Sequence, residues 1–139
     1  MGYVLKNIFL IALFIGILYP CSCLEPLPPE DAYLEADVVF SGEVVNIVLD
    51  DSGYYYVVSF QLVHLWKGEV SNDVIIFTES EGSMCGYDFQ INQEYLVYAY
   101  SYDWGVYTNN CTRTNVLENA LEDLEFLDSL NNQDCDDIE

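Results

Sequence analysis

Two long runs rich in β-branched and aromatic residues, 37–49 and 54–66, stand on either side of a polar sequence. In the second run, alternate apolar positions place one face of a strand toward a core: Val58, Phe60, Leu62 and Trp66. His64 interrupts that face, and Asp50-Asp51-Ser52-Gly53 between the runs is rich in turn-forming residues. The pattern predicts an antiparallel hairpin of two long strands, with a bulge or bend at Gly42.

Three shorter apolar runs follow, at residues 73–78, 94–100 and 105–108. The last two are joined by a turn around Asp103-Trp104-Gly105, and a polar loop over 79–86 precedes them. Five short strands with bent, glycine-marked members suit a closed barrel better than a flat sheet. We therefore predict an all-β fold with flanking helices, in which a five-stranded OB-fold-like β-barrel carries a C-terminal helix packed on it.

Helical patterns flank the predicted barrel. Residues 24–29 hold three prolines and should be extended, and Pro29 can open a short helix over 30–35. Near the end of the chain, Asn115 and Glu118 form a capping-box pattern. The helix that it predicts has one apolar stripe that should pack on the barrel: Leu117, Leu121, Leu124 and Leu127.

The first 20 residues have the pattern of a signal peptide. Lys6 supplies a positive charge, and residues 8–18 form an apolar run too short to span a bilayer. We expect residues 1–20 to be removed, a single domain over 21–130, and an acidic, frayed tail over 131–139. The protein is then expected to be secreted and extracellular, with a cell-surface or periplasmic location as the alternative.

The end of this leader is irregular. Pro20 precedes Cys21, whereas signal peptidase prefers a small residue before the cut. The sequence Leu18-Tyr19-Pro20-Cys21 also departs from the motif for lipidation, which requires a small residue before the cysteine. The cleavage point therefore stays open, and we expect contact with a membrane only if Cys21 is lipidated.

Acidic residues dominate the charge. The chain has 24 acidic and three basic residues, for a formal net charge of −21, and after Cys23 the basic residues are Lys67 and Arg113. Without a basic stripe, nucleic acid and anionic membrane surfaces are poor partners. The acids favour a strongly solvated surface, with specific cation binding as the lesser alternative, and we expect a monomer.

The reactive side chains argue against an enzyme. His64 is the single histidine, so neither a histidine-based metal site nor a catalytic triad can be assembled, and no phosphate loop or cofactor motif occurs. We expect no cofactor and no metal of its own. Five cysteines in an exported chain predict disulfides, but choosing the odd residue and pairing the rest allows fifteen arrangements.

Six segments in order resemble the inhibitory N-terminal domain of the tissue inhibitors of metalloproteinases, a netrin-like module. They are Cys21-Ser22-Cys23-Leu24, Ala36-Asp37-Val38-Val39-Phe40, Leu65-Trp66-Lys67-Gly68, Cys85-Gly86-Tyr87, Glu94-Tyr95-Leu96-Val97-Tyr98-Ala99 and Cys111-Thr112-Arg113-Thr114. The resemblance spans nearly the whole chain after residue 20. It implies an OB barrel with helices beside it and the bridges Cys21–Cys85 and Cys23–Cys111, and it leaves Cys135 unpaired.

The resemblance also implies a zinc metalloprotease as partner. Cys21 would chelate the catalytic zinc of that protease through its α-amine and carbonyl oxygen. Ser22 would enter the specificity pocket, and Cys23 and Leu24 would line the cleft. Two alternatives remain: the cysteines near the terminus only staple the chain, or the protein is a non-inhibitory netrin-like binding module, extracellular or surface-attached, working through its acidic barrel face.

Overall fold

A computed structural model describes residues 21–80 and 85–133. The predicted signal peptide at 1–20, the end of the predicted tail and Cys135 lie outside the described residues. The elements, in order, are α2 (Pro29–Glu35), β1 (Val38–Leu49), β2 (Tyr55–Lys67), β3 (Asp73–Glu79), β4 (Glu94–Tyr102), β5 (Gly105–Tyr107), β6 (Asn115–Val116), the 3₁₀ turn η1 (Leu117–Asn119) and α3 (Leu121–Gln133).

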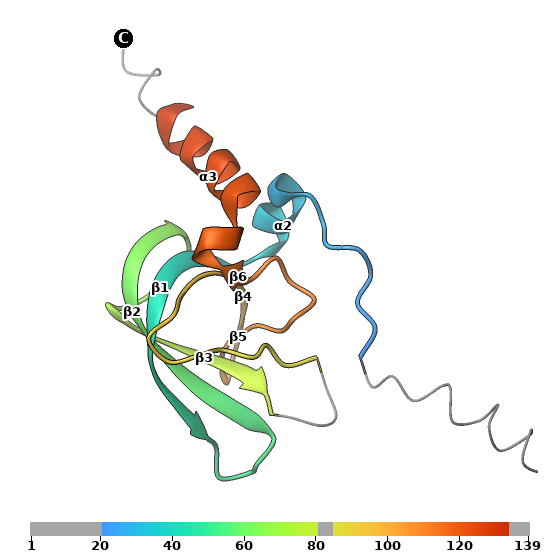
Figure 1. Cartoon of the computed structure of the whole chain (residues 1–139), viewed down its shortest axis with the longest axis vertical. Helices are drawn as coiled ribbons and strands as arrows, with labels where there is room; N and C mark the ends of the chain where they lie inside the picture. The colour runs from blue at the N-terminus through green and yellow to red at the C-terminus, as the bar shows by residue number, and fades with distance from the viewer. Residues whose placement is uncertain (1–20, 81–84, 134–139) are drawn as a thin grey trace, which may run out of the picture.

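Five strands close into a barrel (Figure 1). The order is β1-β2-β3-β5-β4, and pairing of β1 with β4 completes the circle, while the two-residue β6 adds to the far edge of β4. Neighbours are antiparallel except β3 and β5, which run parallel. The predicted OB-fold-like barrel with a C-terminal helix is confirmed.

Bulges allow β1 to belong to two pairings. Its register against β2 shifts at three places, one of them between Ser41 and Gly42. A Cβ atom at Gly42 would lie 2.8 Å from the carbonyl oxygen of Gln61, so only glycine permits this approach. The resulting bend turns the first half of β1, Val38 to Glu43, onto β4.

Aromatic side chains fill the barrel. Phe60 contacts the rings of Phe40, Phe89 and Tyr95 edge to face, with ring centroids 5.2 to 6.5 Å apart. Val58 and Phe60 of the predicted inner face of β2 are buried, whereas Leu62 and Trp66 are half-buried and His64 is exposed. Beyond the bulges Trp66 leaves the barrel interior and packs against the helices instead.

A second apolar cluster joins α2 and α3 to the barrel, built from Ala32, Ala36, Val39, Leu96, Tyr98, Ala120 and Leu127. The predicted capping box is wrong, because Asn115 pairs with Leu96 in β6 and the helix begins only at Leu121. Since η1 interrupts the helical phase, Leu121 falls outside the packed stripe and is 65% exposed. Among the described residues no helix is long and apolar enough to cross a bilayer.

Candidate functional site

The segment that follows residue 20 has no regular structure and runs along the outside of the protein (Figure 1). Two disulfides fasten it. Cys21 is bridged to Cys85 and Cys23 to Cys111, with Cα atoms 5.3 and 5.1 Å apart. Bridges over separations of 64 and 88 residues each stabilise a fold by about 4–5 kcal/mol on the chain-entropy estimate. The structure thus contains the two pairings that the resemblance implied.

The four bridged sulfur atoms form one compact group, all within 4.8 Å of one another. A sulfur in a disulfide is not a thiolate and does not act as an ordinary metal ligand, so the bridged group is a covalent clamp. The two loops that supply the clamp are also joined directly, because the Asn110 backbone N–H donates to the Cys85 carbonyl oxygen at 2.7 Å. Residues 21–23, which we define as the tip, are therefore held from two loops at once.

Arg113 holds the other end of this segment. Its guanidinium donates to the Leu27 carbonyl oxygen at 2.9 Å and forms charge-assisted bonds to both carboxylate oxygens of Asp123, at 2.6 and 2.8 Å. Asp123 is buried and also accepts from the Tyr98 hydroxyl at 2.8 Å. The hydrogen bonds to Asp123 raise the pKa of Arg113, and burial together with the same carboxylate raises the pKa of Tyr98.

Threonine hydroxyls fix the loop that carries Cys111 and Arg113. Thr108 Oγ1 donates to the Tyr98 carbonyl oxygen at 2.7 Å, and Thr114 Oγ1 accepts from the Tyr98 N–H at 3.0 Å. Both threonines are buried. Because both threonines bond to the backbone of one residue of β4, the loop is attached directly to the barrel.

Side chains next to the clamp point outward. Ser22, Cys23 and Glu25 are exposed, and Leu24 is 91% exposed. An almost bare leucine on a segment fixed by two bridges is a surface feature that a partner protein could cover. The predicted contact residues Ser22, Cys23 and Leu24 thus lie together on an accessible surface.

Gly86 allows the bridged loop to lie against β3. A Cβ atom at this position would overlap the backbone carbonyl of Glu79. The close approach places Cys85 beside the end of β3, where the Tyr87 N–H donates to the buried Thr78 Oγ1 at 2.8 Å. Glycine is therefore needed at position 86, because any side chain would overlap the backbone of β3.

Replacing Gly86 with alanine is expected to lower the free energy of unfolding by about 1–3 kcal/mol, because the methyl group forces the backbone apart. Urea unfolding followed by tryptophan fluorescence, with the disulfides intact, measures the change. Asp88→Ala, at an exposed position two residues later, is the matched control and should stay within about 0.5 kcal/mol. Equal stability of Gly86→Ala and the natural protein would contradict the close fit.

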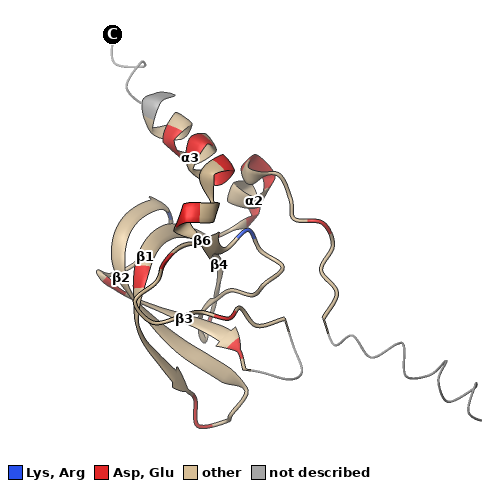
Figure 2. Ribbon diagram, in the orientation of Figure 1, with Lys and Arg blue, Asp and Glu red and all other residues tan. Residues whose placement is uncertain are grey.

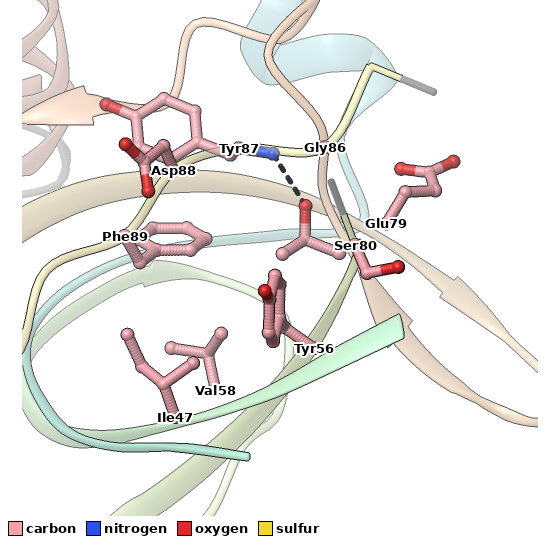
Figure 3. A pocket seen from close by; sticks show the side chains of 10 residues that line it. Ile47, Tyr56, Val58, Glu79, Ser80, Gly86, Tyr87, Asp88 and Phe89 are labelled. Atoms are coloured by element: carbon pink, nitrogen blue, oxygen red, sulfur yellow. Dashed lines mark hydrogen bonds between the residues drawn. The ribbon is translucent and has the colours of Figure 1, made fainter. Parts of the chain in front are cut away.

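A cavity of about 430 Å³ opens beside this loop (Figure 3). Its wall includes the apolar or aromatic side chains of Ile47, Tyr56, Val58 and Phe89, and Glu79 and Asp88 also line it. Burial raises the pKa of Tyr87, at the same wall, to about 12, helped by the neighbouring Tyr95 and Asp88. The sequence patterns do not indicate this cavity, because its walls come from β1, β2, the end of β3 and the loop that follows β3.

The chain is similar to proteins of known function. No protein-family model matches the chain. Proteins called metalloproteinase inhibitor 3 are similar to it: 29% identical over 96 residues in Gallus gallus (66% of this chain, 45% of the relative), 29% in Xenopus laevis and 28% in Scyliorhinus torazame. The chain is thus similar to metalloproteinase inhibitors over 66% of its length. The matched residues cover less than half of each inhibitor.

The sequence did not predict the ion pair between Arg113 and Asp123. One signal was present, since Arg113 is one of two basic residues after Cys23 in a chain with 24 acids. A lone cation in that setting is expected to have acidic partners. The fold alone shows which carboxylates pair with Arg113 and that Arg113 also holds the segment after residue 20 at Leu27.

Proposed function

We propose that the protein is a secreted inhibitor of zinc metalloproteases that acts through Cys21 once residues 1–20 have been removed. The observation that carries the proposal is the covalent fixing of residues 21–23 on two neighbouring loops, in a chain similar to metalloproteinase inhibitors. The protein would act as an inhibitor and not as an enzyme.

The chemistry rests on the backbone of the first residue. A catalytic zinc has three protein ligands and one position open to water. The α-amine and the carbonyl oxygen of a terminal Cys21 would close a five-membered chelate ring at that position and displace the water. The amine must be neutral to donate, and an ordinary α-amine pKa of about 7.7–8.0 makes this inexpensive near neutral pH.

The residues after Cys21 would supply contacts in the cleft. Ser22 would enter the specificity pocket, and Cys23 and Leu24 would line the cleft walls. Leu24 is 91% exposed, and burying such a side chain contributes about 1.5–3 kcal/mol. Because the two bridges and Arg113 already order this segment, little conformational entropy is lost on docking.

The experiment is to secrete the full chain from a host cell and map its N-terminus by mass spectrometry. We expect a chain that begins at Cys21 with a free amine and inhibits zinc endopeptidases but not serine proteases. An acylated or extended terminus, or a free Cys21 that inhibits none of a broad panel of zinc endopeptidases, would overturn the proposal.

The cavity of Figure 3 favours a second candidate, the non-inhibitory netrin-like binding module. Apolar walls with Glu79 and Asp88 beside them suit a small ligand that has an apolar body and a cationic group. The binding site in this candidate is the cavity and not the acidic barrel face expected from composition. Acids are dense on α2 and α3 (Figure 2). Ligand binding of this kind would persist when the Cys21 amine is blocked.

A further inference from the structure

Five aromatic side chains form a continuous cluster on the outside of the barrel, which we call the aromatic platform: Tyr55, Phe77, Tyr102, Trp104 and Tyr107. Trp104 contacts all of the others, with ring centroids 5.3 to 6.0 Å away. The rings of Trp104 and Tyr102 are parallel to within 3°, and each residue is 52% exposed. Trp104 and Tyr102 are therefore stacked on each other, while the rings of Tyr55, Tyr107 and Phe77 are inclined to Trp104 by 38°, 65° and 79°. The platform is a cluster of packed rings whose two most exposed members are the stacked pair.

Strand alternation explains why the platform faces outward. Ile76 and Thr78 of β3 are buried, so Phe77 between them points away from the core. The hairpin from β4 to β5 then folds over Phe77, and Gly105 makes this possible. Gly105 has a φ of 148°, and a Cβ atom there would lie 2.7 Å from the Phe77 ring.

The location matches the ligand face of the OB-fold. Proteins with this barrel bind oligonucleotides or oligosaccharides on strands 2 and 3 and on the loops between strands 1–2 and 4–5. Here Tyr55 comes from β2, Phe77 from β3, and Trp104 from the β4–β5 turn. The position of the platform is therefore compatible with either a nucleic acid or a sugar ligand.

Charge decides between them. Single-stranded nucleic-acid sites combine stacking rings with a positively charged groove. The two basic residues after Cys23 are engaged elsewhere, since Lys67 donates to the carbonyl oxygens of Tyr33 and Leu34 and Arg113 pairs with Asp123 (Figure 2). In the described part of the chain nothing is left to neutralise a phosphate backbone at the platform.

Carboxylates accompany the rings instead. The Tyr107 hydroxyl donates to the Glu79 carboxylate, with 2.6 and 2.7 Å to its two oxygens. Asp103 is exposed and lies between Tyr102 and Trp104 in sequence. Carboxylate oxygens accept hydrogen bonds from sugar hydroxyls, and the electron-rich faces of the rings attract the polarised C–H groups of a sugar face. Both features suit a neutral sugar and oppose a polyanion.

We propose that the aromatic platform binds a neutral, β-linked polysaccharide whose flat sugar faces contact the exposed part of the stacked Trp104–Tyr102 pair. This function is separate from the tip and does not depend on inhibition. It would hold the protein on an extracellular polysaccharide matrix while Ser22, Cys23 and Leu24 remain exposed.

Retention of the secreted protein on insoluble cellulose and on chitin tests the proposal, with affinity electrophoresis in soluble mixed-linkage β-glucan beside it. We expect retention on at least one of them that survives 1 M salt, because the contact is not ionic. Trp104→Ala should weaken it about tenfold or more, and Trp104→Phe should weaken it less. Inhibition of a protease should not change in either variant.

Tyr54→Ala is the matched control. Tyr54 is adjacent to Tyr55, is 69% exposed, and has no ring contact within the described residues. Binding by Tyr54→Ala should equal that of the natural protein, with circular dichroism confirming that all variants fold. The proposal is overturned if none of the three polysaccharides is bound, if Trp104→Ala binds as well as the natural protein, or if the platform retains only single-stranded DNA, neutral lipid vesicles or a protein.

Discussion

Acetylation of the Cys21 α-amine is expected to raise the inhibition constant for a zinc metalloprotease by about a thousandfold or more, corresponding to about 4 kcal/mol of lost binding. The acetyl group removes the lone pair that would bind zinc and places three heavy atoms where the metal must sit. The bridges Cys21–Cys85 and Cys23–Cys111 are untouched by this reaction, so the fold should be unchanged. Inhibition kinetics before and after acetylation measure the effect.

The composition makes the modification unusually selective. After residue 20 the chain has a single lysine, Lys67, so a reagent for amines has two targets in the mature protein. Lys67 donates to the carbonyl oxygens of Tyr33 and Leu34 on the helix side of the barrel. In a Lys67→Arg variant, one added acetyl group by mass spectrometry therefore reports on the terminus alone.

An N-terminal extension and the acetylated Lys67→Arg variant both test whether the Cys21 amine binds zinc. Addition of one alanine before Cys21 should reproduce the loss, because it moves the amine away from the carbonyl oxygen with which it chelates. Undiminished inhibition by the singly acetylated Lys67→Arg protein would mean that another surface inhibits, and the chelation mechanism would have to be abandoned.

Replacement of Asp123 by alanine is expected to lower the free energy of unfolding by about 3–5 kcal/mol, as breaking a buried ion pair usually does. Its carboxylate pairs with Arg113 at 2.6 Å and accepts from the buried Tyr98 hydroxyl at 2.8 Å. Without it the hydroxyl is left buried without an acceptor and Arg113 loses its closest partner. Urea unfolding with the disulfides intact measures the loss.

The neighbouring residue supplies the control. Glu122 pairs with the same guanidinium at 2.7 Å, but its side chain is 74% exposed, against 6% for Asp123. Exposed ion pairs contribute about 0–1 kcal/mol, so Glu122→Ala should change stability little. Similar losses in the two variants would show that burial of Asp123 does not set the strength of the network.

Weaker inhibition by Asp123→Ala is also expected. Asp123 positions the Arg113 guanidinium, which in turn holds the segment after residue 20 at Leu27.

Most of the barrel followed from local patterns. The alternation in 54–66 and the turn at 50–53 correctly predicted the hairpin of β1 and β2, because period-two burial and turn chemistry are properties of adjacent residues. Pro29 begins α2 as expected. The cysteine pairings could not be derived from spacing among fifteen arrangements and came from the resemblance alone.

The local sequence pattern predicted the wrong helix start because a distant strand pairs with the residues expected to begin the helix. Asn115 has the sequence context of a helix cap, yet Leu96 of β4 pairs with it in β6. The helix then starts at Leu121 and runs to Gln133, beyond the predicted start of the tail. Tertiary pairing overrode a capping preference of about 1 kcal/mol, which is well within what strand pairing and burial can supply.

By itself the sequence determined a closed acidic barrel, a closely spaced cysteine pair after residue 20 and the scarcity of cations that could recognise a polyanion. Only the tertiary structure decided that Arg113 reaches Leu27, 86 positions away, and that aromatic rings from β2, β3 and the β4–β5 hairpin meet in one platform. The physical reason is the range of the forces involved. Alternation, turns and net charge are set by neighbours or by composition, whereas these contacts exist only after barrel closure brings separate strands together.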